Sequence, residues 1–242
     1  MPRREVTHHR DALSIHWAFT DAADGDLSVD GDPDDLSVRR SRIAPHPWTW
    51  LRQVHGSEVV HVHTPGDFCD ELADAAVTMV PDAVLAVHSA DCAGIVLSAT
   101  DRNGQPIIGV VHAGWRGLES GVVQHTVQQM RDLGGDGFTW DLGPCISPGA
   151  YEFGTEALDV LRTRYGNVVV GETLDGKPAL DLRAGVRVAL GESGVTTEAM
   201  TGPPPCTALD PGFYSWRARG DTGRQAAVAW LASPDERYPW HP

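Results

Sequence analysis

The sequence has few cysteines and no long uninterrupted apolar run. The chain has four cysteines, Cys69, Cys92, Cys145 and Cys206. These are too few and too scattered for a disulfide scaffold, so we expect reduced thiols. The longest apolar stretch, residues 83–99, contains His88, Asp91 and Cys92, which argues against a membrane span. The charged N-terminal residues precede no apolar segment of the signal-peptide type. We therefore expect a cytoplasmic protein without a membrane partner.

Basic residues are also scarce. The chain has 19 Lys and Arg against 33 Asp and Glu, a formal net charge of −14. An acidic surface repels phosphate backbones, so we expect no nucleic acid polymer as partner. Small phosphorylated or nucleoside ligands remain compatible, because a local basic pocket can oppose the overall field. The basic cluster at Arg39, Arg40 and Arg42 could bind phosphate, although a solvated face is the more ordinary explanation of such a cluster.

Apolar periodicity predicts an α+β fold of mixed β-sheets packed with flanking helices. No repeat, linker or composition shift marks a boundary, so we expect a single domain over residues 1–242. Strands are predicted over residues 11–20, 48–54, 59–63, 84–87, 95–98, 107–111, 138–142 and 168–170. Helices are predicted over 118–130, 155–165 and 181–190, with a helical turn at 70–76, a loop at 21–35 and a final apolar element at 225–231.

Three strand-like segments lead into a residue of metal-ligand type that is followed closely by glycine. They carry His55 in the sequence QVHG, Cys92 in ADCAG and His112 in HAGWRG. Polar side chains where strands give way to Gly-rich turns are common in active sites. Each residue alone has an ordinary explanation, since buried cysteine behaves as a small hydrophobe and single histidines on turns usually meet water. Together, two imidazoles and a thiolate make a Zn²⁺ set with an open fourth position.

Other polar residues near these segments have two explanations each. Asp91 could orient a ligand histidine or move a proton, or it could be purely structural. Arg116, at the start of the predicted helix, could bind an oxyanion or form a surface salt bridge. Cys145 could be a second thiol at the site or merely packed. His61 and His63 share a strand face and could bind copper or zinc, although an exposed pair is the more ordinary interpretation.

Four segments resemble the purine nucleoside phosphorylase family related to the peptidoglycan editing factor, which has been called polyphenol oxidase or laccase-like. The segments are residues 53–56 (QVHG), 90–92 (ADC), 112–117 (HAGWRG) and 143–146 (GPCI). The likeness continues through residues 213–217 (FYSWR) and 222–224 (TGR). It spans residues 48–231, whereas the N-terminal part, about 1–45, departs from the family pattern.

The resemblance implies zinc bound by His55, Cys92 and His112, with Cu²⁺ as a possible alternative metal. It implies phosphorolysis of adenosine, inosine and methylthioadenosine, together with deamination of adenosine. Nucleosides and phosphate are then the expected partners, and the protein is expected to be a monomer or homodimer. The expected catalytic residues are Cys92, His112 and Asp91. The expected substrate-binding residues are Gln53, Arg116, Cys145, Arg217 and Arg224.

Alternatives from other functional classes stay open at this point. A multi-copper oxidase would need several His-x-His pairs, and the chain has one, His61 and His63. A metal-free hydrolase would use Cys92 as nucleophile, with His55 or His112 as base. Editing of peptidoglycan precursors and non-catalytic ligand binding are further possibilities. Analysis of bound metal separates the zinc, copper and metal-free hypotheses.

Overall fold

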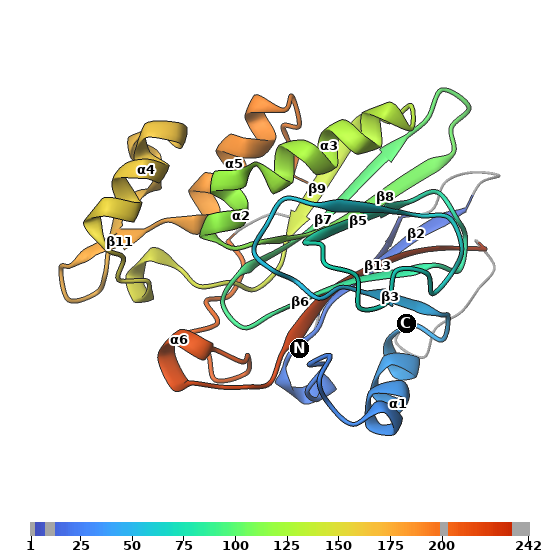
Figure 1. Ribbon diagram of the computed structural model, residues 1–242, viewed down its shortest axis with the longest axis horizontal. Helices are drawn as coiled ribbons and strands as arrows, with labels where there is room; N and C mark the ends of the chain where they lie inside the picture. The colour runs from blue at the N-terminus through green and yellow to red at the C-terminus, as the bar shows by residue number, and fades with distance from the viewer. Residues whose placement is uncertain (1–2, 8–12, 199–202, 234–242) are drawn as a thin grey trace.

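The structure, a computed structural model, describes residues 3–7, 13–198 and 203–233. Two β-sheets stack face to face, with helices on both outer faces, and this confirms the predicted α+β class (Figure 1). The first sheet has the strand order β1 (Arg3–Thr7), β2 (Ser14–Phe19), β13 (Gln225–Ala232), β6 (Val84–Ser89), β3 (Trp48–Trp50). The second has the order β12 (Thr197–Glu198), β9 (Asp136–Leu142), β7 (Ala93–Thr100), β8 (Pro106–Ala113), β5 (Ala75–Thr78), β4 (Val59–Val62).

The five-stranded sheet joins segments from both ends of the chain. Strand β13 lies between β2 and β6 and is antiparallel to both. Strand β3 pairs parallel to β6, with Trp48 opposite Val84. The five-stranded sheet therefore contains strands from both ends of the described chain, and the single domain stays a prediction.

The six-stranded sheet is built around the hairpin of β7 and β8, in which Ala93 pairs with Ala113. Strand β9 lies on the other side of β7, and β5 lies on the other side of β8, both antiparallel. Strands β4 and β12 add parallel edges. All eight residues of β8 are buried, which fits a central strand covered on both faces.

Three apolar clusters hold these layers together. The first fills the space between the sheets and includes Phe19, Leu85 and Val110. The second lies between the six-stranded sheet and α2 (Trp115–Ser120), α3 (Val122–Asp132), α4 (Thr155–Tyr165) and α5 (Leu182–Glu192). The third packs α1 (Pro33–Ile43) against the other sheet through Ile43 and Trp230. Figure 1 shows α1 on one side of the sandwich and α2, α3 and α5 on the other.

The remaining helices and strands of the described chain are short. They are η1 (Ala22–Asp24), η2 (Pro148–Ala150), η3 (Asn167–Val169), β10 (Val170–Glu172), β11 (Pro178–Leu180) and α6 (Trp216–Arg219). None of the helices in the described part of the chain has the length and apolar character needed to cross a membrane.

Several predicted elements need correction. Helix α1 was not predicted, because the pattern of residues 21–35 indicates a loop and the basic cluster after them indicates a solvated face. Its N-cap is Asp32 and its first residue is Pro33. These are ordinary helix-start signals, masked here by a low apolar content. The helical turn predicted at 70–76 is wrong, because turns occupy residues 65–70 and β5 begins at Ala75.

Other predictions were right in type but not in extent. The strand predicted over 48–54 ends at Trp50. The helix predicted over 118–130 is split by Gly121, whose φ of 84° lies in the left-handed region. The strand predicted over 168–170 is wrong for residues 168 and 169, which belong to a 3₁₀ turn, and only Val170 is in a strand, the first residue of β10. The helix at 155–165 is confirmed, and the final apolar element is strand β13. Residues 11 and 12 of the first predicted strand lie outside the described residues.

Candidate metal centre

The structure brings His55, Cys92 and His112 together at one end of the two sheets. Cys92 lies in the turn between β6 and β7, His112 is near the end of β8, and His55 is in the loop after β3. Their ligand atoms all lie within 4.8 Å of one another. The sulfur of Cys92 is 3.8 Å from Nε2 of His55, and the two imidazole centroids are 4.9 Å apart.

This donor set fits a metal ion. Zinc binds thiolate sulfur at about 2.3 Å and imidazole nitrogen at about 2.0 Å, so tetrahedral donors lie roughly 3.3–3.8 Å apart. The ligand atoms, which lie within 4.8 Å of one another, would have to approach each other only slightly to reach these separations. Two nitrogens and one sulfur suit zinc and also copper, and they leave a fourth position open. The cluster can therefore hold a metal ion.

Asp74, which sequence reasoning did not include in the site, holds the cluster in place. Its carboxylate is fully buried and accepts hydrogen bonds from the backbone N–H groups of Val54 (3.2 Å), His55 (3.0 Å) and Gly56 (2.7 Å). The same carboxylate lies 2.7 Å from Nδ1 of His112. A carboxylate on Nδ1 keeps the proton there and leaves Nε2 free to bind metal. An aspartate just before a buried strand was the available signal.

The pKa of the Asp74 carboxyl reflects this environment. Burial by itself raises that pKa, but the hydrogen bond and charge of His112, with the backbone N–H groups of Gly56 and Val54, outweigh burial. The net result is a lowered pKa, so Asp74 stays ionised at neutral pH.

Backbone conformation at the cluster is equally restrictive. His55 has a φ of 59° and Asp91 a φ of 109°, values rare for residues other than glycine. A Cβ on Gly114 would lie 2.8 Å from Cδ2 of His55 and 3.1 Å from the sulfur of Cys92. Glycine at position 114 therefore leaves room for two of the three ligand side chains.

Cys92 and His112 form a charged pair when no metal is bound. Burial opposes the Cys92 thiolate, but the charges and hydrogen bonds of His112 and His55 outweigh it and lower the pKa of Cys92 to about 6. Burial likewise opposes the His112 imidazolium, whereas Cys92 and Asp74 raise the pKa of His112 to about 9. A metal ion would replace the His112 proton as the counter-charge to the thiolate.

The metal ligands line a cavity of about 500 Å³. Of the other residues predicted from sequence, four also line it: Gln53, Asp91, Arg217 and Arg224. Cys145 and Arg116 do not. Cys145 is fully buried in the apolar cluster beneath the helices, and burial raises its pKa to about 11. Arg116 is exposed, with its guanidinium 4.4 Å from the ring centroid of Trp115.

Gln53 joins the His55 loop to the neighbouring strand. Its amide nitrogen donates to the carbonyl of His88 and its amide oxygen accepts from the N–H of His88, both at 2.7 Å. The side chain thus continues the β3–β6 pairing beyond Trp50, where the backbone pairing ends. These contacts make Gln53 a positioning residue, and its contact with substrate stays a prediction.

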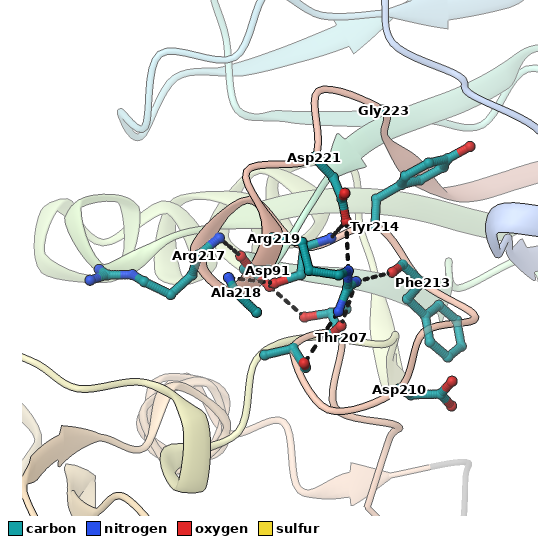
Figure 2. A network of polar contacts seen from close by, with 12 residues as sticks. Asp91, Thr207, Asp210, Phe213, Tyr214, Arg217, Ala218, Arg219, Asp221 and Gly223 are labelled. Atoms are coloured by element: carbon teal, nitrogen blue, oxygen red, sulfur yellow. Dashed lines mark hydrogen bonds and ion pairs between the residues drawn. The ribbon is translucent and has the colours of Figure 1, made fainter.

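Asp91 anchors the C-terminal segment to the turn that carries Cys92, as Figure 2 shows. One carboxylate oxygen accepts from the hydroxyls of Thr207 and Ser215, both at 2.7 Å. The other accepts from the backbone N–H of Arg217, also at 2.7 Å. The carboxylate is thus engaged on both oxygens by the segment that brings Arg217 to the cavity. A catalytic role for Asp91 stays a prediction.

The fold and this site define an α+β protein with a His–Cys–His cluster in a cavity at the end of a two-sheet sandwich. The chain belongs to the family described as multi-copper polyphenol oxidoreductase laccase, whose model matches residues 21–232. A Xylella fastidiosa relative named purine nucleoside phosphorylase is 40% identical over 194 residues, 77% of this chain and 72% of the relative. A Streptomyces griseus relative, purine nucleoside phosphorylase ORF3, is 34% identical and covers 93% of this chain and 99% of its own.

Solved structures show the same fold. A Neisseria meningitidis protein of the DUF152 family matches with a TM-score of 0.76 at 27% identity, over 95% of this chain and 99% of that one. YlmD from Geobacillus stearothermophilus matches with a TM-score of 0.75 at 24% identity, over 96% and 100%. Within the described residues, the His–Cys–His cluster is the one group of three potential ligands close enough to hold a metal ion.

Proposed function

We propose that the protein is a zinc-dependent purine nucleoside phosphorylase acting on adenosine, inosine and methylthioadenosine, with adenosine deaminase activity. The observation that carries the proposal is the convergence of His55, Cys92 and His112 on a cavity also lined by Arg217 and Arg224. In a chain with a net charge of −14, two arginines at one cavity provide the local positive charge that phosphate needs. The relatives named purine nucleoside phosphorylase support the reaction class.

Phosphorolysis requires phosphate and a nucleoside to be held side by side. A phosphate oxygen forms a bond to C1′ of the ribose while the C1′–N9 bond breaks. The bonding electron pair and a proton go to the base, so the products are ribose 1-phosphate and the free base. Arg217 and Arg224 would bind and orient the anion. Tyr151, whose ring centroid is 5.1 Å from the Arg217 guanidinium, would contact the nucleoside from the same wall of the cavity.

Deamination replaces the amino group at C6 of adenosine by oxygen from water, with release of ammonia. Zinc bound by His55, Cys92 and His112 would supply positive charge and a water of lowered pKa for this reaction. The protein's own residues hold the ligands in place. Asp74 fixes the proton on Nδ1 of His112, and the hydrogen bonds that the Asp74 carboxylate accepts from three backbone N–H groups fix the His55 loop.

The test is incubation of purified protein with adenosine, with and without phosphate, followed by chromatography and metal analysis. We expect adenine and ribose 1-phosphate only when phosphate is present, inosine in both cases, and about one zinc per chain. Cys92→Ser should lose metal and both products. Cys69→Ser is the matched control, because Cys69 is exposed and its thiol donates to the carbonyls of Trp48 and Gly66, away from the cavity. Absence of any phosphate-dependent base release contradicts the proposal.

One observation favours a second candidate, a metal-free Cys–His hydrolase. The lowered pKa of Cys92, the raised pKa of His112 and the Asp74 carboxylate on Nδ1 of His112 together have the form of a nucleophile, base and orienting acid. This candidate predicts activity that survives chelation of metal and is abolished by thiol alkylation. The zinc enzyme would lose activity on chelation.

A further inference from the structure

Two neighbouring strands, β6 and β13, bring polar side chains to the α1 side of the five-stranded sheet, next to the metal centre. Val84 and Ala86 belong to the cluster under α1, so alternation along β6 places His88 on the same face. In the neighbouring strand β13, Ala226 belongs to the same cluster, and Arg224 lies two residues before it, immediately before the strand begins. His88 and Arg224 both line the cavity that contains the metal ligands.

Arg40 of α1 points towards this face as well. Leu36 and Ile43 are the buried residues of α1, and Arg40 follows them at helical spacing, four residues after one and three before the other. Its guanidinium carbon lies 5.5 Å from the ring centroid of Trp48 and 5.6 Å from that of Trp50. An arginine at a core-facing position of a helix, between two indole rings, is not the solvated cluster expected from the sequence.

These groups have unused hydrogen-bonding capacity. His88 is 6% exposed, and neither of its ring nitrogens has a hydrogen-bond partner among the described residues. The Nε of Arg40 and one terminal guanidinium nitrogen are likewise buried without a partner there, and no carboxylate of the described chain pairs with Arg40. A buried donor left without a partner costs about 1–3 kcal/mol, more for a charged group. A cationic group and a neighbouring imidazole that lack partners indicate an anionic ligand.

The protonation state of His88 suits a phosphate ion. Burial, together with the charges of Arg40, His112 and Arg224, lowers the pKa of His88 to about 3, so the ring is neutral. A neutral imidazole has one donor and one acceptor nitrogen. Phosphate at neutral pH presents both P–O⁻ acceptors and a P–OH donor, so it can use either nitrogen. Asp30 also lines this part of the cavity, but it lies 3.6 Å from Arg52, which compensates its charge.

We propose that Arg40, His88 and Arg224 form the subsite for inorganic phosphate, beside the metal centre. The proposal rests on the proposed phosphorylase function and adds Arg40 and His88 to the two arginines, Arg217 and Arg224, that the cavity offers to the attacking anion. Arg40 supplies charge from the α1 side, His88 supplies a neutral hydrogen-bonding group, and Arg224 closes the subsite from the start of β13. One terminal nitrogen of Arg224 already donates to the carbonyls of Asp221 (3.1 Å), Thr222 (2.8 Å) and Gly223 (2.8 Å), which holds the side chain in place.

The experiment measures phosphate binding directly, by titration calorimetry of the metal-loaded full chain with inorganic phosphate and no nucleoside. We expect Arg40→Gln and His88→Phe each to weaken binding by about 10- to 100-fold, the scale for loss of a hydrogen bond to a charged group. Arg40→Lys, which keeps the charge, should recover part of the affinity. Arg42→Gln, an exposed arginine on the same helix, and His16→Phe, a buried histidine of β2 that does not line the cavity, should bind like the wild type.

Steady-state kinetics separate this proposal from the proposed function. In an active enzyme, the same variants should raise the phosphate KM and leave the adenosine KM nearly unchanged. Turnover with an unchanged phosphate KM in folded Arg40→Gln and His88→Phe would overturn the subsite while leaving the phosphorylase function intact. Phosphate binding that depends on Arg40 and His88, without nucleoside turnover, would support the subsite and overturn the function. Equal affinity for phosphate in all variants overturns the subsite.

Discussion

Replacing Asp74 by asparagine should impair metal binding, although Asp74 is not a ligand. One carboxylate oxygen serves the His55 N–H and Nδ1 of His112, and the other serves the N–H groups of Val54 and Gly56. An amide has one oxygen and one NH₂ group, so it can accept at only one of these two positions. At the other position, an NH₂ group would face donors that then have no acceptor.

The size of the effect follows from which pair loses its acceptor. If the amide nitrogen faces His112, the ring must present a lone pair on Nδ1 and place its proton on Nε2, where the metal should bind. Loss of such a supporting group lowers metal affinity by about 10- to 100-fold. One or two buried donors without an acceptor should reduce the free energy of unfolding by about 2–5 kcal/mol.

The assay is competition for zinc against a chelator, with thermal melting of the same samples. Asp101→Asn is the matched control, because Asp101 also accepts two backbone N–H bonds, from Asn103 and Gln105 at 2.8 Å each, but in an exposed hairpin turn. It should bind zinc like the wild type. If folded Asp74→Asn also binds zinc with wild-type affinity, the argument that Asp74 sets the proton position on His112 is refuted.

Three further predictions concern the same region. Gly114→Ala should lower metal affinity by at least about tenfold in the same competition assay, because its Cβ would lie 2.8 Å from the His55 ring; an unchanged affinity would show that the ring can move aside. Asp91→Ala should lower the melting temperature by about 5–10 °C through loss of three buried hydrogen bonds, whereas Asp91→Asn should lose less because hydroxyl groups can turn to accept from an amide. Wild-type melting with turnover reduced about 100-fold in Asp91→Asn would instead make Asp91 catalytic. In metal-free protein, the alkylation rate of Cys92 should be half-maximal near pH 6, and added zinc should suppress it. The pKa of Cys92 is depressed from the ordinary 9.0, so the charged pair with His112 stops stabilising the metal-free fold as pH falls through about 6, and it is also lost as pH rises through about 9, where His112 loses its proton; an alkylation midpoint near 9 would contradict the pair.

The class of fold and the three candidate ligands could be predicted from local pattern. Alternation and apolar runs depend on nearest neighbours along the chain, so strands such as β7, β8 and β13 were visible in the sequence. His55, Cys92 and His112 each lie within two residues of a glycine, at or near a strand end, and the residue types alone indicate a metal. The helix at 155–165 has ordinary helical spacing and was predicted to the residue.

The supporting groups were decided by tertiary structure, because their partners lie far away in the sequence. Asp74 meets His112 across 38 positions, and Asp91 meets Arg217 across 126. Cys145 has a sequence context typical of an active site, but it packs in the apolar core away from the cavity. Arg40 has the local sequence of a surface charge, but α1 directs it towards the sheet. Local pattern specifies which side chains are available and which face of an element they occupy. Only the stacking of two sheets determines which of those faces meet, and so which carboxylate holds which histidine.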